Sequence, residues 1–513
     1  MRGERASGVP GRGVWRLRGC WALCVLIGAL LAPSSAVAAV DALAGTSGCL
    51  WKGFVADQHA HDGCASGEVA NYEAIVAAPE GLDVYVADDE GLLRRYARDA
   101  ATGELTTAAG DCWSDQPLGS CSQLLGIAYP TALALSPDGR HLYVGNGDGI
   151  IAVLQRDTAT GALTQSGPPD ACYGPRFSEP TCSFARISSD WITNLEVTPD
   201  GTGVLASIDD QSLAVFVRDP LTGRLTQPPG RAACLGTWGT DNEGNNCHRP
   251  LEHVWTYLDT ATSADGANVY IATDDELLHF NRDAATGVLA LQTCRSYWAH
   301  DGCIATSAAT RWESISIALS PDGRTLYSAG WDELLVFDVD PLTGELTQLA
   351  GSDGCLQRED RHINPVCTAL RGYDAGQSIE VAPDGATVYV VTYYGSLVVF
   401  DRDPATGALS QRSGRAGCIT AAPRPTMSSC LVTGEASASW RLAVSPDSAN
   451  VYALASDDAL LSFGSPAATC RDIVLAERTN AAGFDVRGKC VGLDPDLRVI
   501  ELVGAPAHRR TGP

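Results

Sequence analysis

One turn sequence, close to Ser-Pro-Asp-Gly, recurs seven times and constrains the fold of this chain more than any other feature. The first and last turn prolines, Pro79 and Pro446, stand 367 residues apart over six intervals, or about 61 residues per repeat. Repeats of this length each form one small unit that stacks on its neighbours. The 513 residues therefore predict one array of seven units, not the three domains that length alone suggests. The turns occupy 78–81, 136–139, 198–201, 263–266, 320–323, 382–385 and 445–448.

Each unit continues with the same order of strands and turns. A β-rich run follows the first turn and carries a tyrosine in six units, at Tyr85, Tyr143, Tyr270, Tyr327, Tyr389 and Tyr452, while the third unit has Leu205. A second apolar strand, an Asp-x-x-Thr-Gly turn in six units and a short last strand complete the pattern. Four strands joined by tight turns, without helical periodicity, are typical of a propeller blade. The sequence predicts an all-β fold, a single seven-bladed β-propeller of four-stranded blades.

The seventh unit lacks the Thr-Gly turn and the last strand. The segment 41–49 matches that missing strand and the cysteine that follows it in other units. We therefore expect the N-terminal strand to close the last blade and to remove the free sheet edges between first and last blades.

The first 38 residues have the pattern of a secretory signal peptide. Five arginines precede a short apolar run at 20–32, and Ala36-Val37-Ala38 fits a cleavage site. The alternative is a membrane anchor, but this run is too short to span a bilayer. We predict a secreted protein, extracellular or periplasmic, cleaved near Ala38, with no membrane span in the mature chain.

The cysteines follow the repeat. Each inter-blade segment contains one pair, and the C-terminal segment adds another. An even number of cysteines in a secreted chain predicts local disulfides, whereas zinc sites favour a C-x2-C spacing that no pair shows. The expected pairs are Cys49–Cys64, Cys112–Cys121, Cys172–Cys182, Cys234–Cys247, Cys294–Cys303, Cys355–Cys367, Cys418–Cys430 and Cys470–Cys490. The predicted organisation is a signal peptide at 1–38, a propeller at 39–469 and a tail at 470–513 that contains the Cys470–Cys490 loop.

The two faces of the predicted propeller differ. The first and third turns of each blade form one face, here called the turn face. The second turns and the inter-blade disulfide loops form the other, here called the loop face. Long loops on a rigid scaffold commonly carry binding sites, so we expect a small molecule, a carbohydrate or a protein to bind the loop face. A net charge of −25 and only two lysines argue against nucleic acid. We expect a monomer.

A metal site is one hypothesis for the loop face. The pentapeptide Ala-His-Asp-Gly-Cys occurs at 60–64 and again at 299–303, and acidic residues gather in the second turns. Imidazoles suit zinc, while carboxylates suit a hard divalent cation such as calcium. The alternative is that these are solvated turn residues inherited with the repeat. The candidate ligands are His59, His61, Asp62, His300 and Asp301.

The central channel is the second candidate site. Glu196 and Glu380 occupy the same position in the innermost strands of their blades, three residues before the turn proline. Asp259 and Arg441 lie two positions further from the turn. Such a set could act in acid–base catalysis, as lactone opening requires, or could form only salt bridges along a water-filled channel. Glu73 and the aromatic residues near strand starts could bind a sugar or fill gaps between blades: Tyr129, Trp191, Trp255, Trp312 and Trp440.

The repeat motif resembles a known family. The run Ser-Pro-Asp-Gly-Arg-x-Leu-Tyr at 320–327, followed by Leu-x-Val-Phe-x-x-Asp-x-x-Thr-Gly-x-Leu at 334–346, is similar to lactonase-type seven-bladed propellers. These include 6-phosphogluconolactonase-like proteins and carboxymuconate-cyclising enzymes. The resemblance covers roughly 40–465 and implies the fold, with a lactonase-like hydrolase or cyclase as one activity. Cysteine-stapled loops are not part of the cytoplasmic enzymes' pattern, and this would be a secreted variant.

Two functions follow from these features. The first is a secreted binding protein that presents its disulfide-stapled loops on one face. The alternative is a lactonase-like enzyme in which Glu196, Glu380, Asp259 and Arg441 act around the channel. A serine-hydrolase elbow, a zinc-protease motif and nucleotide-binding glycine patterns are absent from the sequence.

Overall fold

The chain forms seven antiparallel sheets that follow one another in sequence order. The computed structural model describes residues 41–42, 49–52, 65–67, 72–88, 91–107, 110–117, 119–175, 181–188, 190–209, 211–236, 246–251, 256–300, 302–306, 314–361, 364–420, 430–432, 439–455, 459–464, 491–493 and 499–501. Within these residues no helix is long and apolar enough to cross a membrane. The predicted signal peptide and most of the predicted tail lie outside them, apart from the pair β41 (Val491–Leu493) and β42 (Val499–Glu501).

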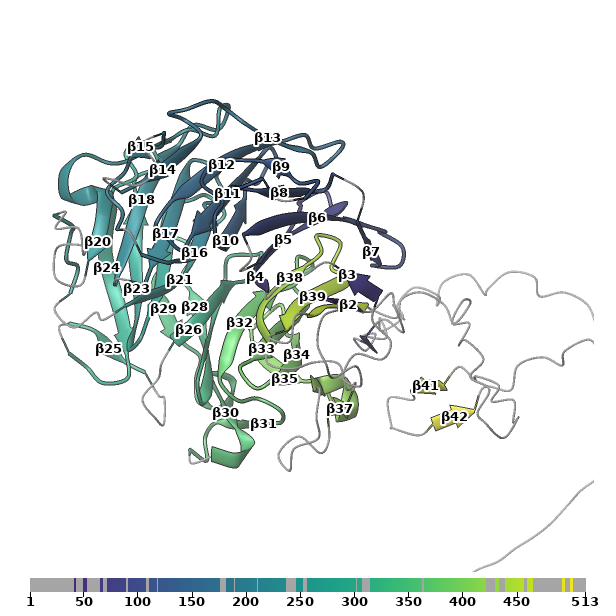
Figure 1. Ribbon diagram of the computed structural model, residues 1–513. Helices are drawn as coiled ribbons and strands as arrows, with labels where there is room; N and C mark the ends of the chain where they lie inside the picture. The colour runs from purple at the N-terminus through teal and green to yellow at the C-terminus, as the bar shows by residue number, and fades with distance from the viewer. Residues whose placement is uncertain are drawn as a thin grey trace, which may run out of the picture. The chain divides into compact units, whose positions relative to one another are not determined.

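The first strand of each sheet contacts the first strands of the two neighbouring sheets, and the seventh also contacts the first, so the sheets form a closed ring (Figure 1). Seven blades were predicted, and this is confirmed. The first strands are β4 (Tyr72–Ala77), β10 (Pro130–Leu135), β16 (Ile192–Val197), β21 (Tyr257–Thr262), β26 (Ser314–Leu319), β32 (Gly376–Val381) and β38 (Ser439–Val444).

Two further strands in each blade continue the antiparallel meander. The second strands are β5 (Asp83–Asp88), β11 (His141–Asn146), β17 (Gly203–Ile208), β22 (Asn268–Thr273), β27 (Thr325–Gly330), β33 (Thr387–Thr392) and β39 (Asn450–Ala455). The third strands are β6 (Leu92–Arg98), β12 (Ile151–Arg156), β18 (Ser212–Arg218), β23 (Glu276–Arg282), β28 (Glu333–Val339), β34 (Ser396–Arg402) and β40 (Ala459–Gly464). Apolar residues of consecutive blades pack together, so the core lies between adjacent sheets.

The outer edge of a blade is more elaborate than the predicted single fourth strand. In the second blade, β12 pairs with both β13 (Leu163–Gln165) and β14 (Cys172–Gly174), and β15 (Ser183–Phe184) adds in parallel to β14. The disulfide explains the parallel strand, because it returns the chain to the edge that the fourth strand leaves open. The other outer strands are β7 (Leu105–Thr106), β8 (Cys112–Ser114), β9 (Ser122–Gln123), β19 (Leu225–Thr226), β20 (Cys234–Gly236), β24 (Leu289–Ser296), β25 (Ile304–Ala305), β29 (Leu346–Gln348), β30 (Cys355–Arg358), β31 (Thr368–Leu370), β35 (Leu409–Gln411), β36 (Cys418–Thr420) and β37 (Leu431–Val432).

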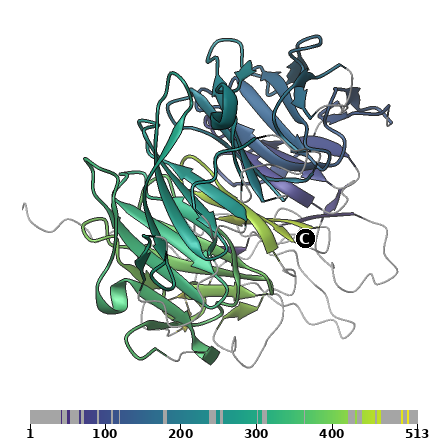
Figure 2. The same ribbon diagram turned by 90° about the vertical axis from the view of Figure 1, so that its left-hand side faces the viewer.

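The N-terminal segment supplies the outer strands of the seventh blade, as predicted. Both β1 (Asp41–Ala42) and β2 (Cys49–Lys52) pair with β40, and β3 (Ala65–Gly67) lies parallel to β2. In Figure 2 the yellow-green strands of this blade lie beside the purple strands of the first blade. The strand that closes the ring therefore comes from the opposite end of the propeller sequence.

Six of the eight predicted disulfides are confirmed, and the other two involve residues or side chains outside the described set. The bonds observed are Cys112–Cys121, Cys172–Cys182, Cys234–Cys247, Cys294–Cys303, Cys355–Cys367 and Cys418–Cys430. The predicted pairs Cys49–Cys64 and Cys470–Cys490 stay predictions.

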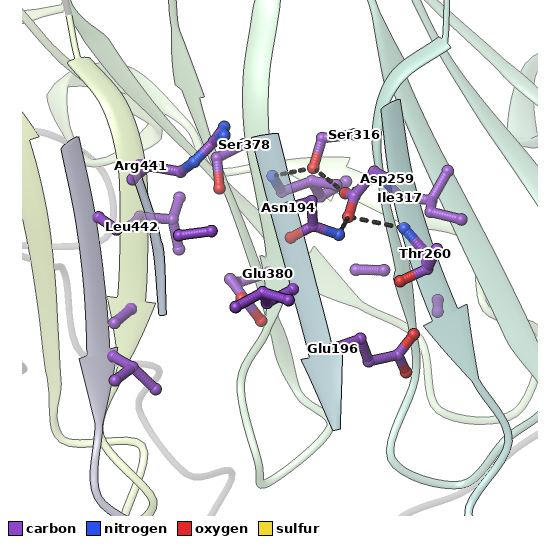
Figure 3. Close-up of a pocket in the computed structure, with 18 of the residues that line it drawn as sticks. Asn194, Glu196, Asp259, Thr260, Ser316, Ile317, Ser378, Glu380, Arg441 and Leu442 are labelled. Carbon is purple, nitrogen blue, oxygen red and sulfur yellow. Dashed lines mark hydrogen bonds between the residues drawn. The ribbon is translucent and has the colours of Figure 1, made fainter. Parts of the chain in front are cut away.

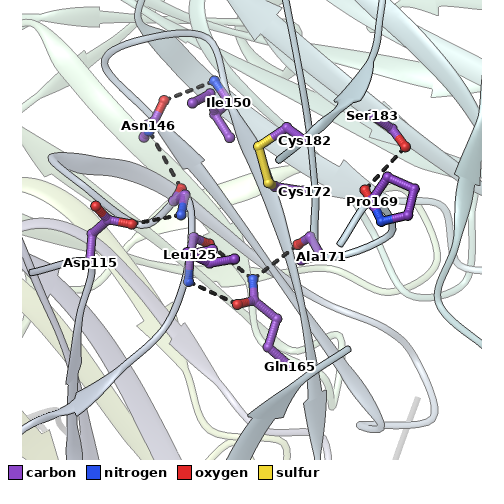
Figure 4. The surroundings of a disulfide bond; sticks show 11 residues. Asp115, Leu125, Asn146, Ile150, Gln165, Pro169, Ala171, Cys172, Cys182 and Ser183 are labelled. Atoms are coloured by element: carbon purple, nitrogen blue, oxygen red, sulfur yellow. Dashed lines mark hydrogen bonds between the residues drawn. A yellow bond between two sulfur atoms is a disulfide. The ribbon is translucent and has the colours of Figure 1, made fainter. Parts of the chain in front are cut away.

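A repeated glutamine holds three of the inter-blade segments against the next blade. Gln165 donates to the carbonyl oxygens of Leu125 and Ala171 at 2.9 and 3.0 Å, and its own oxygen accepts from the Leu125 amide at 2.8 Å (Figure 4). Gln227 and Gln411 make the same three kinds of contact in their blades. The loop face is thus ordered near its base by backbone contacts as well as by disulfides.

The turn motifs connect neighbouring blades on the turn face. Tyr143 donates its hydroxyl hydrogen to the carbonyl oxygen of Gly223 in the next blade at 2.8 Å, and Arg218 of that blade donates back to the Tyr143 oxygen at 2.7 Å. Tyrosine–glycine bonds of this kind also link Tyr85 to Gly161, Tyr270 to Gly344, Tyr327 to Gly407 and Tyr452 to Gly103. The arginine at the end of the third strand was not anticipated from the sequence, although it precedes the turn aspartate in five repeats.

Candidate functional site

The first strands enclose a channel of about 470 Å³ along the axis of the ring. The register of each first strand shifts near its start, so each strand that lines the channel begins with a β-bulge. Beyond the bulge, two ring-shaped layers of residues follow. We call the first the Asp259 layer, with Ala74, Ala132, Asn194, Asp259, Ser316, Ser378 and Arg441, and the second the Glu380 layer, with Val76, Ala134, Glu196, Ala261, Ala318, Glu380 and Ala443.

Asp259 is the centre of a hydrogen-bond network that joins three blades. Its Oδ1 accepts from the side chain of Asn194 at 2.9 Å, and its Oδ2 accepts from the Ser316 hydroxyl at 2.8 Å and the Ile317 amide at 2.9 Å (Figure 3). Burial raises the pKa of the Asp259 carboxyl, while these hydrogen bonds and the charge of Arg441 oppose the increase. The network holds the carboxylate in one orientation, facing the cavity wall.

Arg441 reaches across the channel. Its Nη2 donates to the carbonyl oxygen of Thr193, the bulge residue of β16, at 2.9 Å. Because β4 and β10 lie between β38 and β16 in the ring, this bond joins non-neighbouring blades. Arg441 therefore links two non-neighbouring blades at the level of the Asp259 layer, and its Nη2 group already donates a hydrogen bond to Thr193.

Glu196 and Glu380 lie one layer deeper, where no arginine contacts them within the described residues. Burial raises the pKa of Glu196, and the charge of Asp259 adds to the increase. The Thr260 and Thr262 hydroxyls are near enough to lower this pKa in part, yet Glu196 Oε2 makes no hydrogen bond within 3.5 Å among the described residues. Glu196 thus presents a buried oxygen without a hydrogen-bond donor among the described residues.

Glu380 faces the open space of the channel and is reached by solvent there, although strands surround it on all sides. Its enclosure raises the pKa of the carboxyl to about 8, with a further contribution from the Asp259 charge. At neutral pH this residue is therefore a hydrogen-bond donor as well as an acceptor. A carboxyl group with this pKa can exchange a proton near neutrality.

The structure brings all four predicted channel residues into one cavity. Three carboxyl groups and one arginine line it, and the arginine is partly engaged. The cavity therefore suits a polar, neutral or cationic molecule better than a phosphate. Asn194 and Ser316 were missed as site residues, although each occupies the same repeat position as Asp259 and could have been found by that register.

Three of the predicted ligand-binding residues meet on the loop face instead. Glu73, Tyr129 and Trp191 line a separate groove of about 180 Å³. Asp148, which also lines it, belongs to the acidic second turns that were considered for cation binding. Trp255 and Trp312 lie outside the described residues, and Trp440 belongs to β38, but its side chain is not described.

Of the five candidate metal ligands, His300 lies within the described residues. His300 Nε2 lies 3.4 Å from Glu276 Oε1. Within the described residues, no group of three or more potential metal ligands comes together. His59, His61, Asp62 and Asp301 lie outside them, so a divalent cation at these residues stays a prediction.

Among the described residues, exposed aromatic side chains are confined to one face. Six large aromatic residues are exposed, and all six lie in the second turns or the inter-blade segments of the loop face, with Phe184 in β15: Tyr129, Phe184, Trp191, Trp298, Trp331 and Tyr394. Three of them pair with a neighbouring aromatic ring, Trp331 with Tyr393 at 6.0 Å between ring centres, Tyr394 with Tyr393 at 5.0 Å and Trp298 with Tyr297 at 5.3 Å. The turn face exposes aliphatic residues instead, such as Leu221 and Leu342.

No protein-family model matches the chain, and no curated protein matches it in sequence. Among solved structures, it is similar to a candidate 6-phosphogluconolactonase of Bacteroides uniformis, with 20% identity, 67% of this chain and 85% of that chain covered, and a TM-score of 0.45. The periplasmic gluconolactonase of Pseudomonas aeruginosa gives 17% identity, 68% and 85% coverage, and a TM-score of 0.44. The propeller domain of Cps50 (Swd1) from Myceliophteria thermophila gives 13%, 77% and 97%, and 0.46. A likeness of this degree says nothing about activity.

Proposed function

We propose that this protein binds a ligand through its loop face, in an oxidising compartment outside the cytoplasm. The observation that carries the proposal is that the exposed aromatic side chains of the described residues are confined to that face. Aromatic residues are enriched where proteins contact ligands and partners, because they combine a large apolar area with little conformational freedom. Six disulfides fit an extracellular or periplasmic protein, and secretion with cleavage near Ala38 is part of the proposal.

The two faces are stabilised by different contacts, and this difference supports the proposed function. On the turn face, buried arginines and tyrosines tie adjacent blades together. On the loop face, disulfides and glutamine contacts order the bases of the loops. Ordered loops lose less conformational entropy when a ligand binds, which increases affinity.

Binding assays with residues 39–513 test the proposal. The probes are a panel of soluble oligosaccharides and of short basic, acidic and neutral peptides. We expect at least one probe to bind, and Trp191→Ala or Trp331→Ala to weaken it by about tenfold, as truncation of an interface aromatic residue commonly does. Leu342→Ala is the matched control, since Leu342 is 92% exposed on the turn face. Binding of no probe, or binding lost only in Asp259→Asn, would overturn the proposal.

The channel supports a second candidate function, a lactonase-like hydrolase. The raised pKa of Glu380, about 8, favours it, because this carboxyl could exchange a proton with a substrate at neutral pH. The test is hydrolysis of δ-gluconolactone, followed as acid release above the spontaneous rate. A hydrolase would lose roughly a hundredfold in rate in Glu380→Gln and none in Leu342→Ala. Hydrolysis at the spontaneous rate would eliminate this candidate.

A further inference from the structure

A groove separate from the channel lies on the loop face where the first three blades meet. It has a volume of about 180 Å³ and is lined by Glu73, Tyr129, Pro130, Thr131, Gly147, Asp148 and Trp191. Glu73 and Thr131 are the bulge residues of β4 and β10, where the register of the first strand shifts. A bulge re-aims a side chain out of the regular alternation of a strand. The same bulges that start the channel therefore also build this groove.

Two aromatic rings border the groove. Tyr129 and Trp191 occupy the same repeat position in adjacent blades, eight residues before the turn proline, and are 64% and 55% exposed. Tyr129 adopts a φ of 48°, which bulky residues rarely do. Ala375, at the same position in the sixth blade, has a φ of 52°, so the backbone there does not require a tyrosine. The ring of Tyr129 has no evident role in the packing of the blade.

The tryptophan lies beside a glycine of the neighbouring blade. A Cβ placed on Gly147 would lie 3.4 Å from the indole nitrogen of Trp191. Thr131 Oγ1 donates to the carbonyl oxygen of Ile192, the residue after Trp191, at 2.7 Å. The indole therefore lies against the second turn of the neighbouring blade, and the strand that bears it is fixed by an inter-blade hydrogen bond.

The charged residues among the described lining of the groove have one sign. Of its seven described lining residues, Glu73 and Asp148 are acidic and none is basic. The whole chain carries −25, which attracts cations toward its surface. Cations are also attracted to the faces of tryptophan and tyrosine rings, and nearby carboxylates attract the same cation by their charge.

We propose that this groove binds an organic cation, a substituted ammonium or guanidinium group held between the rings of Tyr129 and Trp191 and the carboxylates of Glu73 and Asp148. The proposal rests on the proposed loop-face function and names its ligand class. The groove is smaller than the 300–1,000 Å³ of typical drug-sized ligand sites, which suits one small cationic group, either a free molecule or the end of a peptide side chain.

Choline and its uncharged isostere 3,3-dimethylbutan-1-ol are the probes that test charge. They have nearly the same shape, so a difference in affinity reports the cation. We expect calorimetry to show choline binding that is about tenfold tighter than that of the isostere and weaker at high salt. Equal affinities, or no choline binding, would overturn the proposal. Lysine amide and arginine amide distinguish the source, since tighter binding of either one than of choline assigns the site to a basic peptide side chain.

Substitutions locate the site. Trp191→Ala and Asp148→Asn should each weaken choline by about tenfold, while their melting temperatures stay close to that of the unsubstituted protein because both residues are exposed. Leu342→Ala, on the turn face, is the control and should leave choline binding unchanged. Choline binding that survives Trp191→Ala would overturn the proposal. Sugar or acidic-peptide binding lost in Trp331→Ala, without choline binding, would refute this inference and leave the proposed function intact.

Discussion

Three carboxyl groups share the channel, and their surroundings give them different properties. Asp259 is held by donors from two neighbouring blades. Glu196 has an oxygen without a donor in the described part of the chain, and the pKa of Glu380 is raised to about 8. Their common location follows from the sequence, because the spacing from the turn proline sets which residues face the axis. Their hydrogen bonds do not follow from it, since these depend on side chains of other blades at distances that the repeat does not encode.

Glu380 makes folding stability depend on pH. Its pKa is raised from 4.5 to about 8 in the folded protein, so the folded state binds a proton more tightly than the unfolded state between these values. Stability from this group is therefore fully present below pH 4.5 and is lost as the pH rises toward 8. We expect Glu380→Gln to melt at a higher temperature than the unsubstituted protein at pH 8, with the difference vanishing near pH 4.

Thermal unfolding measured at several pH values checks this expectation. Glu104→Gln, in the Thr-Gly turn of the first blade, serves as a control for the loss of one negative charge on the outside of the ring. A Glu380→Gln advantage that is the same at every pH, or that Glu104→Gln reproduces, would contradict a raised pKa in the channel.

At the scale of the elements, the joints between blades explain why the repeat motif has its composition. A typical joint is one buried group of three residues. It consists of the tyrosine of one blade, a glycine carbonyl of the next blade and the arginine that ends the third strand of that next blade. The tyrosine and glycine are visible in the sequence as repeats, but their pairing across blades is not. The third blade has Leu205 in place of the tyrosine, so its joint to the fourth blade must be held differently. There, Arg282 donates to the Thr202 hydroxyl at 2.9 Å and keeps the ion pair with Asp200 at 3.1 Å. A joint that has the tyrosine contains the same kind of ion pair, between Arg402 and Asp322.

Tyr143→Phe should destabilise the protein by about 1–3 kcal/mol, the usual effect of leaving buried hydrogen-bonding groups unsatisfied. The substitution removes the bond to Gly223 and the acceptor of Arg218. Tyr257→Phe is a closely matched control, because the Tyr257 hydroxyl is fully buried and has no hydrogen-bond partner in the described part of the chain. Denaturant unfolding should show Tyr257→Phe to be neutral or stabilising, and equal losses in the two variants would refute the assigned role of the joint.

The disulfides act at the outer edge of each blade. The Cys172–Cys182 bond spans 10 residues and places β15 beside β14. Replacing both cysteines with serine should cost about 3 kcal/mol in the chain-entropy model and should expose the segment 175–182 to proteolysis. Denaturant unfolding and limited proteolysis measure the two effects. Unchanged stability together with unchanged cleavage would show that strand pairing alone holds this edge.

At the scale of the whole molecule, the repeat count and the missing last strand were sufficient to predict a closed ring of seven blades. The parallel fifth strand was not predictable, because two or three residues carry no periodicity that distinguishes a strand from a loop. The groove at the first three blades was also missed as a unit. Glu73 and Trp191 were noted separately, but the bulges that bring them together appear only in the backbone register.

Closure by the N-terminal strand gives the last prediction. Deleting residues 1–67 removes β1, β2 and β3 and leaves the edge of β40 unpaired, and an unpaired edge of this length promotes association between chains. We expect the protein of residues 68–464 to form oligomers and to unfold less cooperatively than that of residues 41–464. Size-exclusion chromatography and thermal unfolding measure both effects.

A circular permutant separates closure from the loss of sequence. In the sixth blade, Asp401 pairs with Ser410 across the segment Arg402–Leu409, and in the seventh, Gly464 pairs with Asp41 in the corresponding register. Residues 68–464 can therefore be joined to 41–67 through a copy of that eight-residue segment. If pairing of β40 is what closes the ring, the permutant should be monomeric and as stable as residues 41–464, because the same strands meet in the same order. A permutant that associates as the truncated chain does would show that the ring depends on where the chain begins, and that strand pairing at the seventh blade is not sufficient for closure.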